Sequence, residues 1–92
     1  MKEEGKMRVK KKPVIVDAFR WDGTLETLNR LRNLGVKMVS YVTETSVHSL
    51  VISSLEGEEL VGDGDWIVKG IKGEFYPVRS DIFELTYEVI EE

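Results

Sequence analysis

The sequence predicts an α+β domain. We expect an antiparallel, strongly twisted sheet or partly open barrel of about five to seven strands, one amphipathic helix and a short C-terminal helix. Short segments rich in β-branched and aromatic residues alternate with glycine-containing turns. Leucines at every third position occur in a single segment. The chain has 92 residues, which suits one small core, so we expect a flexible basic N-terminal arm over 1–11 and a single domain over 12–92.

Composition and charge exclude several functional classes. The formal net charge is −4, so strong attraction to nucleic acid or to an anionic membrane is not expected. The chain has no cysteine, which excludes a disulfide scaffold and a thiolate zinc site and fits a reducing cytoplasm. No apolar run approaches the roughly 20 residues of a membrane helix. The charged start MKEEGKMRVKKK is not followed by an apolar segment typical of a signal peptide.

The N-terminal third predicts a strand followed by a helix. Residues 13–21 (PVIVDAFRW) are rich in β-branched and aromatic residues, with apolar groups on both faces, so we expect a strand that lies centrally or crosses from one core to another. Thr24 is a good N-cap residue, and Gly35 suits the position after the helix end. The leucines expected to cover a sheet are Leu25, Leu28, Leu31 and Leu34.

The remaining residues predict short strands connected by tight turns. Gly57 can supply the positive φ that a hairpin turn requires, and Gly70 and Gly73 flank a second turn, which indicates a glycine-assisted hairpin. Pro77 cannot donate to a ladder, so its strand should lie at an edge or end there. Asp81 and Glu84 have capping-box spacing at the start of a short helix. We expect strands at 36–43, 47–53, 59–61, 66–71 and 74–78, turns at 44–46, 55–58 and 72–73, a helix from 80, and a last strand at 87–90.

A series of short motifs runs along most of the chain. Residues 12–16 (KPVIV) and 19–21 (FRW) are followed by 54–57 (SLEG), 64–70 (GDWIVKG), 73–77 (GEFYP), 81–83 (DIF) and 86–88 (TYE). This series resembles that of a family of small phage and prophage proteins whose activity is unassigned. The resemblance implies a phage or prophage origin, a place in the host cytoplasm and one common fold, and it implies no activity.

This chain departs from the family pattern at four places. Val78 stands where cysteine is common, Arg79 replaces lysine, Ser80 replaces proline, and Asp63-Gly64 replaces Pro-Gly. The loss of the cysteine argues against a thiol-based role at that position.

The residue patterns lack a recognisable metal, phosphate or catalytic motif. His48 is the only histidine, and one histidine cannot form a catalytic triad or a multi-histidine metal site. A calcium loop starting at Asp63 would place Ile67 and Val68 where an oxygen ligand and a glycine are required. Ile67 also occupies the third glycine position of a dinucleotide-binding loop starting at Gly62. We therefore expect no catalytic residue, no metal site and no cofactor.

Carboxylates are the remaining candidates for acid–base chemistry. No pattern marks any pair as buried, so a shifted pKa is not expected for them. Asp65 is expected to accept hydrogen bonds from the turn that follows it, and Asp81 is expected to cap the last helix. The candidates are Asp17, Glu56, Asp65, Glu74 and Asp81.

The hairpin over residues 66–78 offers a candidate ligand surface. Trp66, Val68, Phe75 and Pro77 fall on alternate positions of this hairpin, while Lys69, Tyr76 and Arg79 supply hydrogen-bond donors. Aromatic rings beside basic side chains suit a nucleotide or a single nucleic-acid strand, since bases stack and phosphates pair with Lys or Arg. The alternative is that one aromatic face belongs to the core and the other is ordinary sheet surface. The candidate ligand-binding residues are Trp66, Lys69, Tyr76 and Arg79.

Three functions from different classes follow. The first is a non-enzymatic phage-type accessory protein, a binding or interaction module that self-associates through edge strands. The second is a binder of a nucleotide or signal molecule, such as a sponge that counters host defence. The third is a hydrolase using carboxylates and a bound divalent metal. The absence of a catalytic constellation favours the first, with a host protein as a further possible partner.

Overall fold

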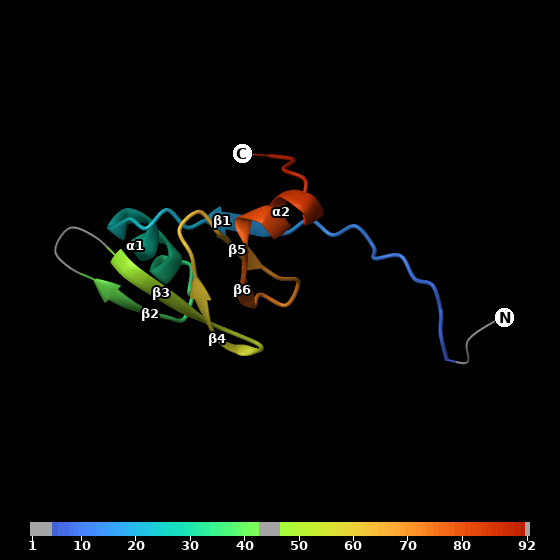
Figure 1. Ribbon diagram of the computed structural model, residues 1–92, viewed down its shortest axis with the longest axis horizontal. Helices are drawn as coiled ribbons and strands as arrows, with labels where there is room; N and C mark the ends of the chain where they lie inside the picture. Colours follow the sequence, from blue (N-terminus) through green and yellow to red (C-terminus); the bar gives the residue numbers. More distant parts are fainter. Residues whose placement is uncertain (1–4, 43–46, 92) are drawn as a thin grey trace.

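The computed structural model describes residues 5–42 and 47–91, and it confirms the α+β class (Figure 1). Within these residues it has six strands and two helices. The elements are β1 (Asp17–Arg20), α1 (Leu25–Asn33), β2 (Met38–Val42), β3 (Val47–Ser54), β4 (Gly57–Val61), β5 (Trp66–Lys69), β6 (Phe75–Val78) and α2 (Ser80–Thr86).

The strands form two three-stranded antiparallel sheets, not the single sheet or partly open barrel expected. Sheet A has the order β1-β5-β6, and sheet B has the order β2-β3-β4. The Gly70 amide donates to the Glu74 carbonyl (2.7 Å). Because backbone direction alternates along a strand, the amides and carbonyls of Tyr76 and Val78 also point toward β5. Pro77 therefore lies at the outer edge of β6, where it has no N–H to donate. This explains why β6 packs beside β3 and β4 without joining their ladder.

Helix α1 begins and ends as expected. The Thr24 hydroxyl accepts a hydrogen bond from the Thr27 amide (3.1 Å), and Gly35 follows the helix with a φ of +92°. Leu28 and Leu31 are buried, but Leu34 is 44% exposed. A repeat of three residues drifts around a helix of 3.6 residues per turn, which moves the last leucine off the buried face.

The first strand is shorter than expected, and it lies at an edge of sheet A rather than at its centre. Asp17 pairs with Lys69, the last residue of β5, so no strand residue faces the chain before Asp17. Residues 6–16 form neither helix nor strand, and 5–15 are exposed. Residues 5–10 lead away from the body of the molecule, as Figure 1 shows. The radius of gyration is accordingly 16.0 Å, against about 12 Å for a compact chain of this length.

The main core lies between α1, sheet B and one face of sheet A. Ile67 belongs to this cluster, while its neighbour Val68 is equally buried on the opposite face of sheet A. Adjacent strand residues point to opposite faces, so sheet A must be covered on both sides. The buried residues of the cluster are Trp21, Leu28, Leu31, Val36, Leu50, Ile52, Val61 and Ile67.

Two expectations for the C-terminal part of the chain are wrong, and one for the middle of the chain falls on residues that the structure does not describe. The strand expected at 87–90 is absent, since these residues adopt no regular structure. Helix α2 has Arg79 at its N-cap without a side-chain cap hydrogen bond, so the expected capping by Asp81 is wrong. The turn expected at 44–46 lies outside the described residues. In the described part of the chain, no helix is long and apolar enough to span a membrane.

The burial of β3 allows a matched stability test. Leu50 is fully buried, whereas Leu55 at the β3–β4 turn is 80% exposed. We expect Leu50→Ala to lower the free energy of unfolding by about 2–5 kcal/mol, because it removes methyl groups and leaves a cavity. Leu55→Ala should change it by about 0.5 kcal/mol or less. Urea denaturation followed by circular dichroism measures both, and equal effects would contradict this description of the core.

Candidate functional site

The register of the β5–β6 hairpin divides the candidate residues between two faces. Trp66 pairs with Val78, and Val68 pairs with Tyr76. Directly paired residues of an antiparallel ladder lie on the same face. Phe75 therefore lies opposite Lys69, on the other face. Trp66 and Val68 therefore lie on one face and Phe75 and Pro77 on the other, because even-numbered residues of β5 pair with even-numbered residues of β6.

Helix α2 packs its aromatic residues onto the face that carries Trp66. The Trp66 and Phe83 rings are stacked, with centroids 4.2 Å apart and planes inclined by 9°. The Phe83 and Tyr87 rings stack in turn at 4.8 Å. The Arg20 guanidinium lies 5.7 Å from the Trp66 ring centroid. Trp66 is thus part of an intramolecular aromatic stack rather than an open platform for a base.

Tyr76 is tied to the same stack through its hydroxyl. The Tyr76 and Tyr87 hydroxyl oxygens are 3.2 Å apart and share a hydrogen bond. Partial burial, this hydrogen bond and the nearby charges of Tyr87 and Glu74 raise the pKa of Tyr76 to about 12. The phenol is therefore neutral at physiological pH and acts as a hydrogen-bonding group, not as a base.

The structure brings together only part of the predicted ligand-binding set. Trp66 and Tyr76 share a face, while Lys69 projects from the opposite face. Arg79 is exposed at the start of α2, where its guanidinium lies 3.0 Å from the Asp81 carboxylate. An ion pair this exposed is strongly screened by water. These four residues therefore do not form a single enclosed site.

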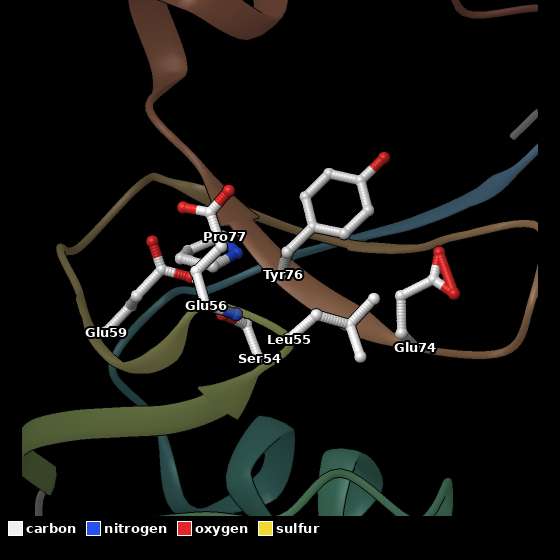
Figure 2. A pocket seen from close by; sticks show the side chains of 7 residues that line it. All are labelled: Ser54, Leu55, Glu56, Glu59, Glu74, Tyr76 and Pro77. Atoms are coloured by element: carbon white, nitrogen blue, oxygen red, sulfur yellow. Dashed lines mark hydrogen bonds between the residues drawn. The ribbon is translucent and has the colours of Figure 1, made fainter.

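A pocket of about 340 Å³ opens between the tip of the β3–β4 hairpin and β6 (Figure 2). Three carboxylates and no basic side chain line it, so it favours a cation over a phosphate. Tyr76 is the one candidate ligand residue in its wall, and Glu59 was missed by the sequence reasoning. The acidic run at 56–59 was the available signal. The lining residues are Ser54, Leu55, Glu56, Glu59, Glu74, Tyr76 and Pro77.

Two carboxylates of this pocket, and Asp65 outside it, already accept hydrogen bonds from the protein itself. Glu59 accepts from the Ser54 hydroxyl (2.5 Å), and Glu74 accepts from the Lys72 amide (3.1 Å). Asp65 accepts from the Gly62 amide (3.2 Å), which precedes it, and from the Ser80 amide at the start of α2 (3.0 Å), rather than from the turn that follows it. Among the described residues, no group of three or more His, Asp or Glu side chains is arranged to hold a metal ion.

A second and larger opening was not expected from the sequence. It is a groove of about 840 Å³ between the extended segment 11–16 and the C-terminal part of the chain. Its lining is mainly aliphatic and includes three charged residues. The lining residues are Lys11, Lys12, Pro13, Val14, Ile15, Val16, Val78, Ile82, Thr86, Tyr87, Glu88 and Ile90.

No protein-family model matches the chain, and comparisons with curated proteins and with solved structures found no match. The resemblance to phage and prophage proteins therefore stays a prediction. The function is inferred from this chain's own surfaces.

Asp65 and Asp63 provide a matched test within one turn. Asp65 bonds two backbone amides, one of them at the start of α2. We expect Asp65→Ala to lower the free energy of unfolding by about 1–3 kcal/mol, since both amides lose a charged acceptor. Asp63→Ala should change it by about 0.5 kcal/mol or less, because Asp63 is exposed. Thermal and urea unfolding measure both variants, and a larger effect of Asp63→Ala would refute the role given to Asp65.

The raised pKa of Tyr76 predicts a loss of stability in alkali. The folded state holds this proton more tightly than the unfolded chain, whose tyrosine pKa is about 10. The contribution is complete below about pH 10 and is lost as pH rises through about 12. We expect the stability of Tyr76→Phe to depend less on pH in this window. Tyrosinate absorbance during alkaline titration should show one late ionisation that this variant lacks.

Proposed function

We propose that this protein is a small phage- or prophage-type accessory protein that acts as a non-enzymatic interaction module in the cytoplasm, and that it self-associates. The supporting observation is the apolar groove beside segment 11–16. Ile15 is 80% exposed on one side of it, and Ile82 and Ile90 are 45% and 64% exposed on the other. Contiguous apolar surface of this kind is typical of a protein–protein contact.

The distribution of charge supports contact between copies. Residues 1–12 carry six Lys or Arg against two Glu, whereas residues 13–92 carry seven Lys or Arg against fifteen Asp or Glu. The arm and the body therefore have opposite signs. Attraction between the arm of one copy and the body of another raises the rate of encounter and favours one orientation.

The two other functions are less well supported. The Phe83 ring occupies one face of Trp66, and the Arg20 guanidinium lies 5.7 Å from the Trp66 ring centroid, so a base would compete with these contacts. The pocket beside Tyr76 carries three carboxylates, which repel phosphate. For the hydrolase, Glu59, Glu74 and Asp65 already accept hydrogen bonds from the protein. An interaction module requires neither the loss of the Trp66 contacts nor the loss of these hydrogen bonds.

Sedimentation velocity over a range of concentrations tests the proposal. We expect a mass above the 10.5 kDa of one chain. Ile82→Lys in the groove should weaken association at least about tenfold, since it places a charge in the apolar contact. Ile71→Lys is the matched control, because Ile71 is 77% exposed and does not line the groove.

Mono-, di- and cyclic nucleotides should give no thermal shift. A monomer at every concentration, or strong stabilisation by a nucleotide, would refute the proposal.

A further inference from the structure

We propose that a second copy of this chain pairs with the free edge of β1 in an antiparallel orientation, across a two-fold axis. Two copies of sheet A would then form one continuous six-stranded sheet. This inference rests on the self-association proposed above, and it specifies the strand that mediates it. An isologous contact of this kind closes at two copies.

The hydrogen bonds around Trp21 show which backbone groups of β1 are available. The Trp21 amide donates to the Asp65 carbonyl (2.8 Å), and its carbonyl accepts from the Gly64 amide (2.7 Å). Both groups of Trp21 thus point toward the β5 side. Backbone direction alternates along a strand, so Ala18 and Arg20 direct their amides and carbonyls to the opposite edge. No strand of the described residues pairs with β1 there.

The chain before β1 lengthens this edge. Residues 13–16 run directly into the strand and adopt no helix or strand of their own. In the proposed pairing the strand alternation continues through these residues, so Val14 and Val16 would direct their backbone groups outward with Ala18, and Ile15 would direct its own to the other side. Val14 is 49% exposed and Ile15 is 80% exposed. An extended apolar edge with unpaired amides and carbonyls is a template for pairing with another strand.

The other edge of sheet A is unsuited to this role. It is formed by β6, where Pro77 has no amide hydrogen to donate. This edge also packs beside β3 and β4 of the same chain. Of the two edges of sheet A, β1 is therefore the one that can accept a partner.

Charge complementarity identifies the partner as a second copy. Antiparallel pairing lays the residues before one β1 along the end of the partner's β1. Arg8 and Lys10 would then approach Asp22 and Asp63 of the partner copy. These two carboxylates lie on adjacent loops, since Asp63 Oδ1 is 3.2 Å from the position that a Cβ on Gly23 would take. Hydrogen bonds from Thr24 lower the pKa of Asp22, so it is charged at neutral pH.

Arg20 lies at the same end of β1 but is already engaged. Its Nε donates to the Gly64 carbonyl (3.2 Å), and its guanidinium lies over the Trp66 ring. The two-fold axis repeats the contact of basic arm and acidic loops at both ends of the paired strands. It also places Val14 and Val16 of the two copies side by side, next to the apolar groove.

A pair of proline substitutions in the full chain tests the edge pairing. Val16→Pro removes an amide that points outward, and β1–β5 pairing begins only at Asp17. Ile15→Pro is the control, because the Ile15 amide points to the opposite side, where the proposed ladder has no bond. We expect Val16→Pro to weaken association at least about tenfold and Ile15→Pro less than about threefold. Circular dichroism and urea midpoints should show that both variants stay folded.

Charge reversal tests the orientation. Lys10→Glu and Asp63→Lys should each weaken association, and the two together should recover most of the loss. Both effects should diminish at high salt. Recovery would support antiparallel pairing, while additive losses would overturn it.

The possible outcomes separate this inference from the proposed function. Oligomers that are insensitive to Val16→Pro and to the charge reversals would overturn edge pairing and leave self-association intact. A monomer at all concentrations would overturn both, and the occupant of the β1 edge would then be a strand of another protein.

Discussion

The structure depends on the burial of β5 on both of its faces. Ile67 and Val68 are neighbours in the strand, and neither is exposed to solvent. Each contributes about 1.5–3 kcal/mol when fully buried, so the sheet is stable only with a cover on both sides. Sheet B and α1 cover the Ile67 face. The Val68 face is covered by α2, whose Phe83 stacks on Trp66.

Helix α2 cannot stand alone, and its attachment explains the role of the candidate aromatic residues. It has seven residues, fewer than the roughly 12–15 at which isolated helices become even marginal in water. Its position comes from the stack of Trp66, Phe83 and Tyr87 and from the bond between the Ser80 amide and Asp65. The aromatic candidates for ligand binding, Trp66 and Tyr76, therefore mainly hold α2 and Tyr87 against sheet A. Among the described residues, the acidic pocket, the apolar groove and the β1 edge stay open.

Local features could be predicted from the sequence because their causes are local. The cap at Thr24, the left-handed glycines Gly35, Gly57 and Gly73, and the β5–β6 hairpin each depend on a few adjacent residues. The edge position of β1 could not be predicted, because apolar residues on both faces of 13–21 suggest a central strand. What decides the outcome is that β5 ends at Lys69, opposite Asp17, so the preceding residues have no partner.

The candidate site was harder to predict than the elements. Alternation identifies the face of each residue within a strand, but the relation between two strands depends on the register set by their turn. The capping of α2 by Asp65, fifteen residues away, leaves no local pattern. The groove depends on the C-terminal residues passing close to segment 11–16. These are contacts between distant parts of the chain, which no spacing of neighbouring residues encodes.

The long connection between β1 and β5 has a consequence for the order in which the sheets can form. The 45 residues between Arg20 and Trp66 must be gathered before these strands pair, whereas five residues separate β5 from β6. Loop closure makes the first pairing about 2 kcal/mol more costly in chain entropy than the second. Each strand of sheet B pairs with its neighbour in sequence, as do β5 and β6. Their pairing therefore does not require the closure of a long loop. We therefore expect β1 to dock late in folding and to detach first, onto a hairpin that is already formed.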